Sequence, residues 1–275
     1  MGKTERCKGQ VNKIENQGKL PRFSYLALKL NSVIMRNLIP IFLIAALFSC
    51  NSGGSKKKAP ASTENYKLEL VWQSDTLFRT PESVLFDRNR EILYVSNVNL
   101  NPWEKDGNGF ISKMDKSGNI LSLKWIEGLN GPKGMGISGN SLYIADINEL
   151  VEANIESGEI ISKIVVEGKP DLNDVTVGSD GTVYVSGSGS NTIYQLKESS
   201  LVPVFKGNDG ERFNGIFKEK DRMLLITSAG GQLREINLET GVANVISENL
   251  GQGDCIVPAG DGGYISTSWK GAVFY

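Results

Sequence analysis

Histidine is absent from the 275 residues, and cysteine is scarce, with only three in the chain. The lack of imidazole excludes Ser-His-Asp and Cys-His catalysis and every histidine-ligated zinc site. Three cysteines are too few for a disulfide framework, and Cys255, inside an expected strand, is predicted to be a small buried hydrophobic residue. Any chemistry therefore depends on carboxylates, amides, lysine and bound ions.

A net charge of one sign is also lacking. The 30 lysines and arginines nearly balance the 31 aspartates and glutamates. Such a balance provides no strong field to attract nucleic acid or anionic lipid. We therefore expect a small-molecule substrate, no nucleic-acid partner, and contact with a membrane only through a lipid anchor.

The anchor is predicted from an apolar run at residues 38–48, which follows the short basic start Met35-Arg36-Asn37. This layout is typical of a secretory signal, and the run is too short for a permanent membrane-spanning helix. The segment Leu47-Phe48-Ser49-Cys50 resembles a bacterial lipobox, in which the cysteine is lipidated. Residues 35–50 are thus predicted to be a lipoprotein signal peptide, and Cys50 to anchor the protein in the bacterial cell envelope, on the outer-membrane or periplasmic side.

The remaining N-terminal residues divide into two parts. Residues 1–34 are basic and lack clear periodicity, so we interpret them as an upstream, non-native leader before a start at Met35. Residues 51–65 are polar and contain two glycines and three consecutive lysines, which predicts a flexible tether. The folded part is expected to cover residues 66–275.

The folded part repeats a pattern about every 40 residues. Each copy has a polar residue opening a short apolar strand, then a strand rich in tyrosine and β-branched residues, then a third strand after a turn. No twelve-residue helical pattern interrupts the repeats, and units of this size and strand content favour an all-β fold, the β-propeller. The first two strands of the five copies lie at residues 81–97, 132–146, 172–186, 213–227 and 253–267.

The number of blades is left between two arrangements. An extra strand at residues 68–73 precedes the first copy, and the fifth copy stops in its third strand. The chain is either a five-bladed ring closed by that extra strand or a six-bladed ring with its last blade truncated. We favour six blades, because chains rarely stop in a strand that leaves an unpaired edge. A polar insert, Asn97 to Gly109, lengthens the first repeat and is expected to be a loop.

One polar residue opens the first strand of every copy, and we call this set the column. The column consists of Glu82, Lys133, Asn173, Asn214 and Asp254. Because the inner strands of a propeller run along its central tunnel, these side chains should meet at one tunnel mouth. Two carboxylates and two amides form an oxygen cage suited to calcium, magnesium or manganese. Taken singly, Asn173-Asp174 and Asn214-Gly215 are also ordinary turn pairs.

The column and the repeat resemble the regucalcin/gluconolactonase family (senescence marker protein) of six-bladed propellers, which are divalent-metal lactone hydrolases and relatives. The resemblance rests on Pro81-Glu82-Ser83-Val84, Phe213-Asn214-Gly215-Ile216 and Gly253-Asp254-Cys255-Ile256. It implies that Glu82, Asn214 and Asp254 bind the metal and that Asp254 is also the general base. The expected metal is calcium first, with magnesium, manganese or zinc as alternatives.

The same resemblance implies that Asn173, in the segment Asp171-Leu172-Asn173-Asp174, faces the substrate, and Lys133 is expected to help orient it. Two departures are visible: Asp171 stands where the family has a substrate-binding arginine, and Cys255 replaces the glycine of an Asp-Gly pair. The metal site is therefore better supported than a sugar-lactone substrate.

Two classes of function follow. The first is a divalent-metal-dependent hydrolase of a lactone or related ester at the tunnel mouth. The second is a non-enzymatic binding propeller on the periplasmic or cell surface, because Gly134-Met135-Gly136-Ile137 and the strand after it also resemble NHL-type repeats. A purely structural role also stays open. Trp103, in the insert, is either a ligand contact or a packed loop residue.

Overall fold

The computed structural model describes residues 13–14, 26–27, 69–74 and 76–275 of the chain. The expected signal peptide, its lipidated Cys50, the tether at 51–65 and most of residues 1–34 lie outside the described residues. All described elements are strands. Within the described ranges there is consequently no helix with the length and apolar character needed to span a bilayer.

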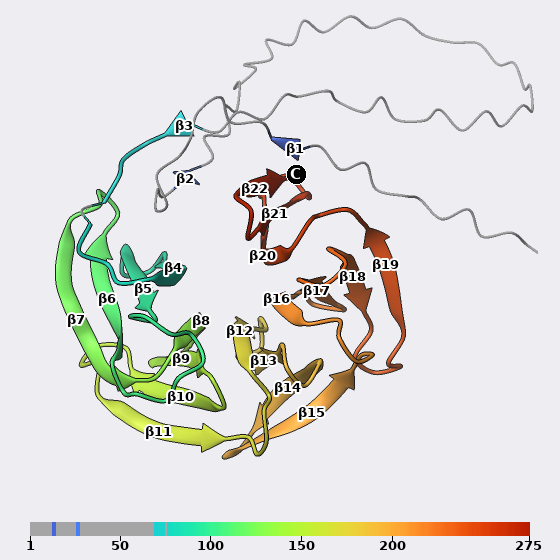
Figure 1. Ribbon diagram of the computed structural model, residues 1–275, viewed down its shortest axis with the longest axis horizontal. Coiled ribbons are helices and arrows are strands. Elements are labelled where there is room, and N and C mark those ends of the chain that lie inside the picture. The colour runs from blue at the N-terminus through green and yellow to red at the C-terminus, as the bar shows by residue number, and fades with distance from the viewer. Residues whose placement is uncertain (1–12, 15–25, 28–68, 75) are drawn as a thin grey trace, which may run out of the picture.

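The strands form five four-stranded antiparallel sheets arranged as blades around a common centre (Figure 1). This confirms the predicted all-β propeller and its five visible repeats. In chain order, blades 1 to 4 consist of β4 (Pro81–Asp87), β5 (Ile92–Asn97), β6 (Gly109–Asp115) and β7 (Ile120–Leu129); β8 (Pro132–Ser138), β9 (Ser141–Asp146), β10 (Glu149–Asn154) and β11 (Ile160–Val165); β12 (Leu172–Val177), β13 (Val183–Gly187), β14 (Thr192–Lys197) and β15 (Ser200–Lys206); β16 (Phe213–Lys218), β17 (Met223–Thr227), β18 (Leu233–Ile236) and β19 (Ala243–Ser247).

Blade 5 takes its fourth strand from the other end of the chain. It contains β20 (Gly253–Pro258), β21 (Tyr264–Ser268) and β22 (Ala272–Phe274), and β1 (Lys13–Ile14) pairs with β22 as its outer strand. The strand β3 (Glu69–Leu70) pairs with β2 (Leu26–Ala27). The extra strand predicted at residues 68–73 therefore does not complete blade 5, and the ring is not closed in that way.

The hydrophobic core lies between blades. Tyr94 and Ile111 of blade 1 meet Met135 and Ile144 of blade 2, and three similar clusters join the later neighbours. The inner strands approach so closely that glycine is required at some positions. A Cβ on Gly136 would lie 2.9 Å from side-chain atoms of the next blade, closer than ordinary van der Waals contact.

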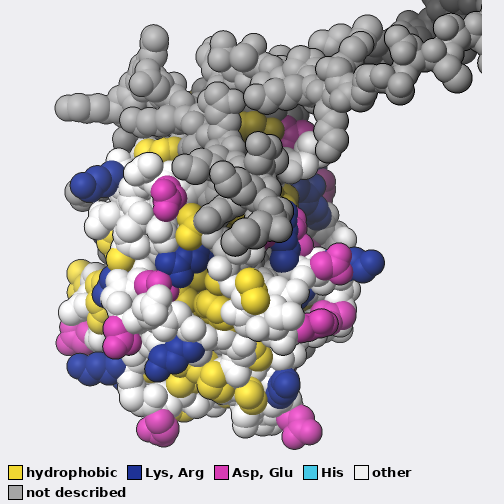
Figure 2. All heavy atoms as spheres, turned by 90° about the vertical axis from the view of Figure 1, so that its right-hand side faces the viewer, with side chains coloured by type: hydrophobic (Ala, Val, Ile, Leu, Met, Phe, Trp, Pro, Cys, Tyr) yellow, Lys and Arg dark blue, Asp and Glu magenta, His cyan; other side chains and the backbone are white. Residues whose placement is uncertain are grey.

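In Figure 1 the described strands of blade 5 and blade 1 do not lie against each other as those of the other consecutive blades do, and we call this gap between the described strands the opening. The predicted insert is a loop that connects β5 to β6 on the first blade. Seen from the side in Figure 2, positive and negative side chains are interspersed and do not gather into a patch of one sign. This agrees with the balanced composition of the chain.

Candidate functional site

Every column residue lies at an irregularity of its inner strand. The antiparallel register shifts once near the start of each of the five inner strands, between Pro81 and Ser83 in blade 1 and at the matching place in the others. Such a bulge re-aims a side chain that would otherwise follow the pleat. The shared bulge therefore places the five column residues at corresponding points of their blades, at the same end of the inner strands, which we call the mouth.

Three blades also share an unusual backbone conformation just before the bulge. Thr80, Asp171 and Arg212 each lie two residues before a column residue and adopt positive φ angles of 47°, 47° and 52°. Non-glycine residues rarely adopt this left-handed conformation, which is frequent near functional sites. The chain thus makes the same sharp entry into β4, β12 and β16.

A hydroxyl group compensates for the ladder bond that the bulge removes. In blades 1, 3 and 5, the N–H group following the column residue donates to a side-chain hydroxyl on the second strand of the same blade. These pairs are Ser83 to Ser96 at 2.9 Å, Asp174 to Ser186 at 3.0 Å and Cys255 to Thr267 at 3.2 Å. The recurring hydroxyl near the end of the second strand was visible in the sequence, although its role was not recognised.

Asn214 and Asp254, predicted metal ligands, are in contact. The Asn214 Nδ2 donates to the Asp254 Oδ1 at 3.3 Å, and the indole Nε1 of Trp269 donates to the same oxygen at 2.9 Å. Burial raises the pKa of Asp254, while the hydrogen bonds from Trp269 and Asn214 act in the opposite direction. Trp269, whose role was not expected from the sequence, thus holds the Asp254 carboxylate in place together with Asn214.

Glu82, the third predicted ligand, faces the same group of charges. No hydrogen bond to its carboxylate is formed by the described part of the chain. Loss of hydration in the tunnel wall, with the charges of Asp254 and Asp174, raises the pKa of Glu82 to about 8, against the opposing effect of Lys133. The charge of Asp254 therefore acts on the Glu82 carboxyl, and the carboxyl oxygens of Glu82 are available to a ligand.

Asp174 is a further carboxylate at the mouth that the column did not include. Its Oδ2 accepts the backbone N–H of Ile216 at 2.8 Å, which links blade 3 to blade 4. Burial raises the pKa of Asp174 to about 7, and the Asp254 charge adds to the shift, although two backbone hydrogen bonds oppose it. The sequence suggested only a turn pair here, so this cross-blade contact was not expected.

Lys133 is placed differently from what its expected role requires. It is only 2% exposed, and its Nζ donates to the carbonyl oxygens of Pro102 at 2.9 Å and Gly131 at 3.0 Å. The Nζ also lies 4.3 Å from the ring centroid of Trp103, a cation–π contact. Burial lowers the pKa of Lys133 despite the nearby carboxylates. Lys133 thus ties the insert to β8, and Trp103, which is 37% exposed, contacts the Lys133 ammonium with its ring.

Asn173 and Cys255 complete the mouth. Asn173 is buried, and its side-chain amide forms no hydrogen bond with any described residue, so it can accept or donate to a ligand. Cys255 lies in β20 as predicted, but the prediction that it is buried is wrong: its side chain is exposed. The reason is its position on the face of β20 opposite to Ile256, which packs against blade 4, and no described blade covers that face.

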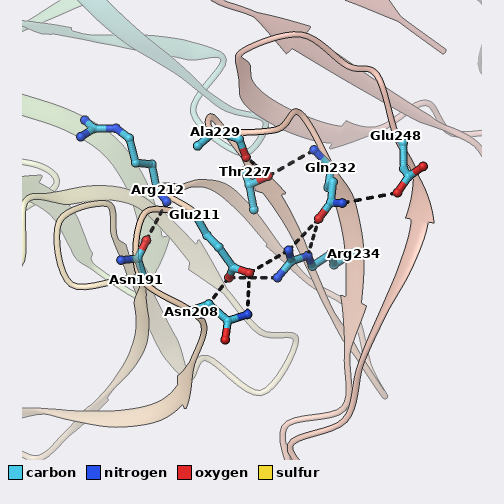
Figure 3. Close-up of polar contacts among 9 residues, drawn as sticks. All are labelled: Asn191, Asn208, Glu211, Arg212, Thr227, Ala229, Gln232, Arg234 and Glu248. Carbon is cyan, nitrogen blue, oxygen red and sulfur yellow. Dashed lines mark hydrogen bonds and ion pairs between the residues drawn. The ribbon is translucent and has the colours of Figure 1, made fainter.

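The loop leading to Asn214 is fixed by a polar network between blades 3 and 4 (Figure 3). Arg234 donates to both carboxylate oxygens of Glu211, at 3.0 and 2.9 Å, and the Asn191 Oδ1 accepts the backbone N–H of Arg212 at 2.6 Å. Bidentate pairs of this kind add geometric precision. The Arg212 side chain points away from the network (Figure 3).

A cation would find a partial ligand set here. Within the described ranges, no three His, Cys, Asp or Glu side chains lie close enough together to hold a metal ion. Asn214 and Asp254 are already adjacent, and a half-turn of the Asn214 amide would present its oxygen beside the Asp254 carboxylate. The unpartnered Glu82 carboxylate supplies a third oxygen donor from the other side of the opening. The donor types therefore suit a hard cation, while the described carboxylates do not surround a single point.

Comparison with known proteins supports the fold. No family model matches the sequence, and no curated protein matches it. Similar solved structures include a catalytically inactive virginiamycin B lyase from Staphylococcus aureus, at 15% identity and a TM-score of 0.55, covering 76% of this chain and 69% of that one. A nidogen/laminin complex matches at 13% identity and a TM-score of 0.60, covering 74% and 77%.

A third similar structure is a protein of unknown function from Bacteroides thetaiotaomicron, with 14% identity and a TM-score of 0.57, covering 76% of this chain and 61% of that one. One of these neighbours is named as a lyase, and another belongs to an assembly of two proteins. At such low identity the likeness shows the fold alone, and this chain is a β-propeller.

Proposed function

We propose that the tunnel mouth binds a divalent cation and a small polar substrate, and that the chain hydrolyses a lactone or related ester, as the regucalcin/gluconolactonase resemblance implies. The observation that carries the proposal is the contact between Asn214 and Asp254 of neighbouring blades, with the Glu82 carboxyl of a third blade near enough for the charge of Asp254 to raise its pKa. Calcium is the first candidate, because carboxylate and amide oxygens are its preferred ligands.

The electrostatics of the mouth support a cation. Glu82, Asp174 and Asp254 all have raised pKa values, chiefly because of burial, and the charge of Asp254 adds to the other two shifts. The nearby ammonium of Lys133 donates to two backbone carbonyls, and no salt bridge joins it to a described carboxylate. A divalent ion would balance the carboxylates that this lysine leaves uncompensated.

The residues would divide the work as follows. Glu82 and Asn214 would hold the ion, whose chemical contribution is Lewis acidity toward an ester carbonyl. Asp254 would be a ligand and would also take the proton of the attacking water, with Trp269 orienting its carboxylate. The free amide of Asn173 would hydrogen-bond the substrate. Lys133 is left out of the substrate contacts because its ammonium holds the insert.

Calorimetric titration of the metal-free chain with calcium tests the cation. We expect Glu82→Gln and Asp254→Asn each to weaken binding at least about tenfold, which corresponds to about 1.4 kcal/mol. Asp180→Asn is the matched control, because Asp180 is exposed in the turn that follows β12, at the far end of that strand from the mouth. Unchanged affinity in both mouth variants would rule out this site.

Hydrolysis is tested separately with aldonolactones and aryl esters in the presence of calcium, magnesium, manganese or zinc. Turnover should require Asp254, so Asp254→Asn should lower it by two orders of magnitude or more, the usual contribution of a general base. Activity that survives this substitution would contradict the assigned role.

A metal-free binding propeller is the second candidate. The absence of a complete ligand cluster among the described acidic and cysteine residues favours it. In that case the free amide of Asn173 and the exposed Trp269 would contact a small molecule directly. Elemental analysis of the purified protein distinguishes the two candidates, because the hydrolase proposal requires about one divalent ion per chain.

The location of the protein is part of the proposal. The lipobox-like segment ending at Cys50 supports a lipid anchor in the cell envelope. Labelling with a clickable palmitate analogue in a bacterial host should mark the chain, and Cys50→Ala should abolish the label. Cys7→Ala is the control and should leave the label unchanged.

A further inference from the structure

Arg212 differs from the arginines that pair with carboxylates of the blades. Ion pairs of that kind are formed by Arg90, Arg222 and Arg234. The Arg212 side chain is exposed, forms no ion pair or side-chain hydrogen bond with a described residue, and extends away from Glu211 in Figure 3. Its guanidinium therefore has its N–H donors available to a ligand.

The backbone that carries this side chain is fixed from two sides. The Arg212 N–H donates to the Asn191 Oδ1 at 2.6 Å, and the Arg212 carbonyl oxygen accepts the N–H of Ser228 at 2.9 Å. With a φ of 52°, Arg212 is in the left-handed region, which a non-glycine residue keeps only where the surrounding contacts determine it. Because the backbone is already ordered, a ligand that binds the guanidinium has less conformational entropy to remove.

The equivalent residue of blade 3 shows where this position points. Asp171 lies two places before Asn173, has a φ of 47°, and its carbonyl oxygen accepts the N–H of Ser188, directly after β13, at 2.9 Å. Arg212 has the same bond to the residue directly after β17. The charge of Asp171 acts on the buried ammonium of Lys133 and opposes the lowering of its pKa by burial. The Asp171 side chain therefore extends toward the column residue of the preceding blade.

By the same backbone geometry, Arg212 extends toward the column residue of blade 3, which is Asn173. Asn173 is 6% exposed, and its side-chain amide forms no hydrogen bond with any described residue. A buried amide without a partner costs about 1–3 kcal/mol, so a ligand that satisfies it gains that free energy. The guanidinium and the amide NH2 group are both donors, and together they suit a negatively charged acceptor.

We propose that Arg212 and Asn173 form a subsite for the carboxylate of a small-molecule ligand, with the guanidinium donating two hydrogen bonds and the amide a third. A carboxylate is favoured over a phosphate because one guanidinium balances a single negative charge, while Glu82, Asp174 and Asp254 already contribute carboxylates to the same mouth. The planar fork of arginine also matches the two oxygens of a carboxylate.

The subsite deepens the proposed function, and as a statement about the substrate of a hydrolase it rests on that function. Arg212 lies two residues before Asn214, which contacts Asp254. A substrate with a carboxylate a few bonds away from its lactone or ester group would thus meet both groups. Arg212 is a specificity residue in this arrangement and takes no part in proton transfer. Binding of the carboxylate needs neither metal nor turnover, so it is tested without them.

The test uses the full chain, labelled with nitrogen-15 and freed of metal by EDTA that is then removed by dialysis. Glutaramate, a monoanion, and glutaramide, its uncharged counterpart, are titrated at pH 6.5 and low salt. The NMR signals of the Arg212 Nε–H and the Asn173 Nδ2 amide are followed. We expect glutaramate to shift both signals and glutaramide to shift neither.

Variants assign the binding to the guanidinium. Arg212→Gln should weaken glutaramate binding at least about tenfold, which corresponds to about 1.4 kcal/mol. Arg212→Lys keeps the charge without the planar fork and should weaken it by a smaller factor. Arg88→Gln is the matched control and should bind as the parent chain does, because Arg88 is exposed in the turn after β4, at the far end of that strand from Glu82. Tm should be the same in all four proteins.

Three results would overturn the proposal. One is equal affinity for glutaramate in the parent chain and Arg212→Gln. Another is an equal shift by glutaramide, which would mean that the carboxylate is not recognised. The third is binding of inorganic phosphate at these two signals when glutaramate does not bind. Failure of the hydrolase proposal is seen separately, because loss of metal binding or turnover with intact glutaramate binding rejects the hydrolase and leaves the subsite supported.

Discussion

The two sides of the tunnel mouth are built from the same repeat but are held in different ways. On the side of blades 3 to 5, hydrogen bonds pass from blade to blade: Asp174 accepts from Ile216, and Asn214 donates to Asp254. On the side of blades 1 and 2, Glu82 has no partner among the described residues, and Lys133 is tied to the insert through Pro102.

This difference shows that one cause places a polar residue at the mouth and another decides which contacts that residue makes. The bulge and the period place a polar residue at the mouth in every blade, but contacts specific to one blade decide whether that residue is engaged. Blades 3 to 5 therefore form the ordered side, with its geometry set by neighbouring blades. Blades 1 and 2 form what we call the adaptable side, where Lys133 contacts the insert and the Glu82 carboxyl forms no hydrogen bond with a described residue.

The largest effect is expected on the ordered side. Asp174→Ala leaves the buried N–H of Ile216 without its acceptor and should lower the free energy of unfolding by about 1–3 kcal/mol. Urea denaturation measures the loss. Asp180→Ala removes an exposed turn carboxylate and should cost about 0.5 kcal/mol or less. Equal losses in the two variants would mean that the cross-blade contact does not stabilise the mouth.

On the adaptable side, Lys133→Ala should release the insert. The ammonium donates to Pro102 and stacks on Trp103, so its removal frees the loop, and it also leaves empty the buried space that the Lys133 side chain fills in β8. We expect amide exchange in residues 99–108 to accelerate about tenfold, or about 1.4 kcal/mol of local opening free energy. Lys105→Ala, at an exposed position of the same loop, is the control. Unchanged exchange in Lys133→Ala would show that other contacts hold the insert.

Glu82 should make the stability of the metal-free protein depend on pH. Its pKa is raised from 4.5 to about 8 in the folded state, chiefly by burial. Below pH 4.5 the Glu82 carboxyl is protonated in both the folded and the unfolded state, and its contribution to stability is fully present. Between these values the unfolded chain releases a proton that the folded chain keeps, so stability falls as pH rises. Tm measured in EDTA should therefore decrease from pH 5 to pH 9.

Glu82→Gln sharpens the comparison. The glutamine resembles the protonated glutamic acid, so Tm should decrease less steeply between pH 5 and pH 9. Glu104→Gln, at an exposed site in the insert, should leave the slope as it is in the parent chain. A slope that is the same in all three proteins would assign the pH dependence to other groups, with Asp174 the first to examine because its pKa is also raised, to about 7.

Much of the ordered side could be predicted from the sequence, because the period of about 40 residues carries the positions of Asn173, Asn214 and Asp254 with it. The adaptable side could not. The burial of Lys133 depends on Pro102, which belongs to a loop outside the repeat and so has no counterpart in other blades. The exposure of Cys255 depends on what lies beside blade 5, which a local pattern of alternating residues does not contain.

The smallest effect on stability, and the most specific one, is expected at the boundary between the two sides. Trp269→Phe keeps an aromatic ring but removes the N–H that donates to Asp254 at 2.9 Å. Because Trp269 is 63% exposed, the stability loss should be about 0.5 kcal/mol or less.

The pKa of Asp254 should rise further in Trp269→Phe, since the lost hydrogen bond favours the charged form. Carbon-13 NMR titration of the Asp254 carboxyl measures the change, and Trp103→Phe, which changes the other tryptophan at the mouth, should leave that titration where it is. If both variants shift it equally, general packing at the mouth, and not the indole hydrogen bond, controls the charge of Asp254.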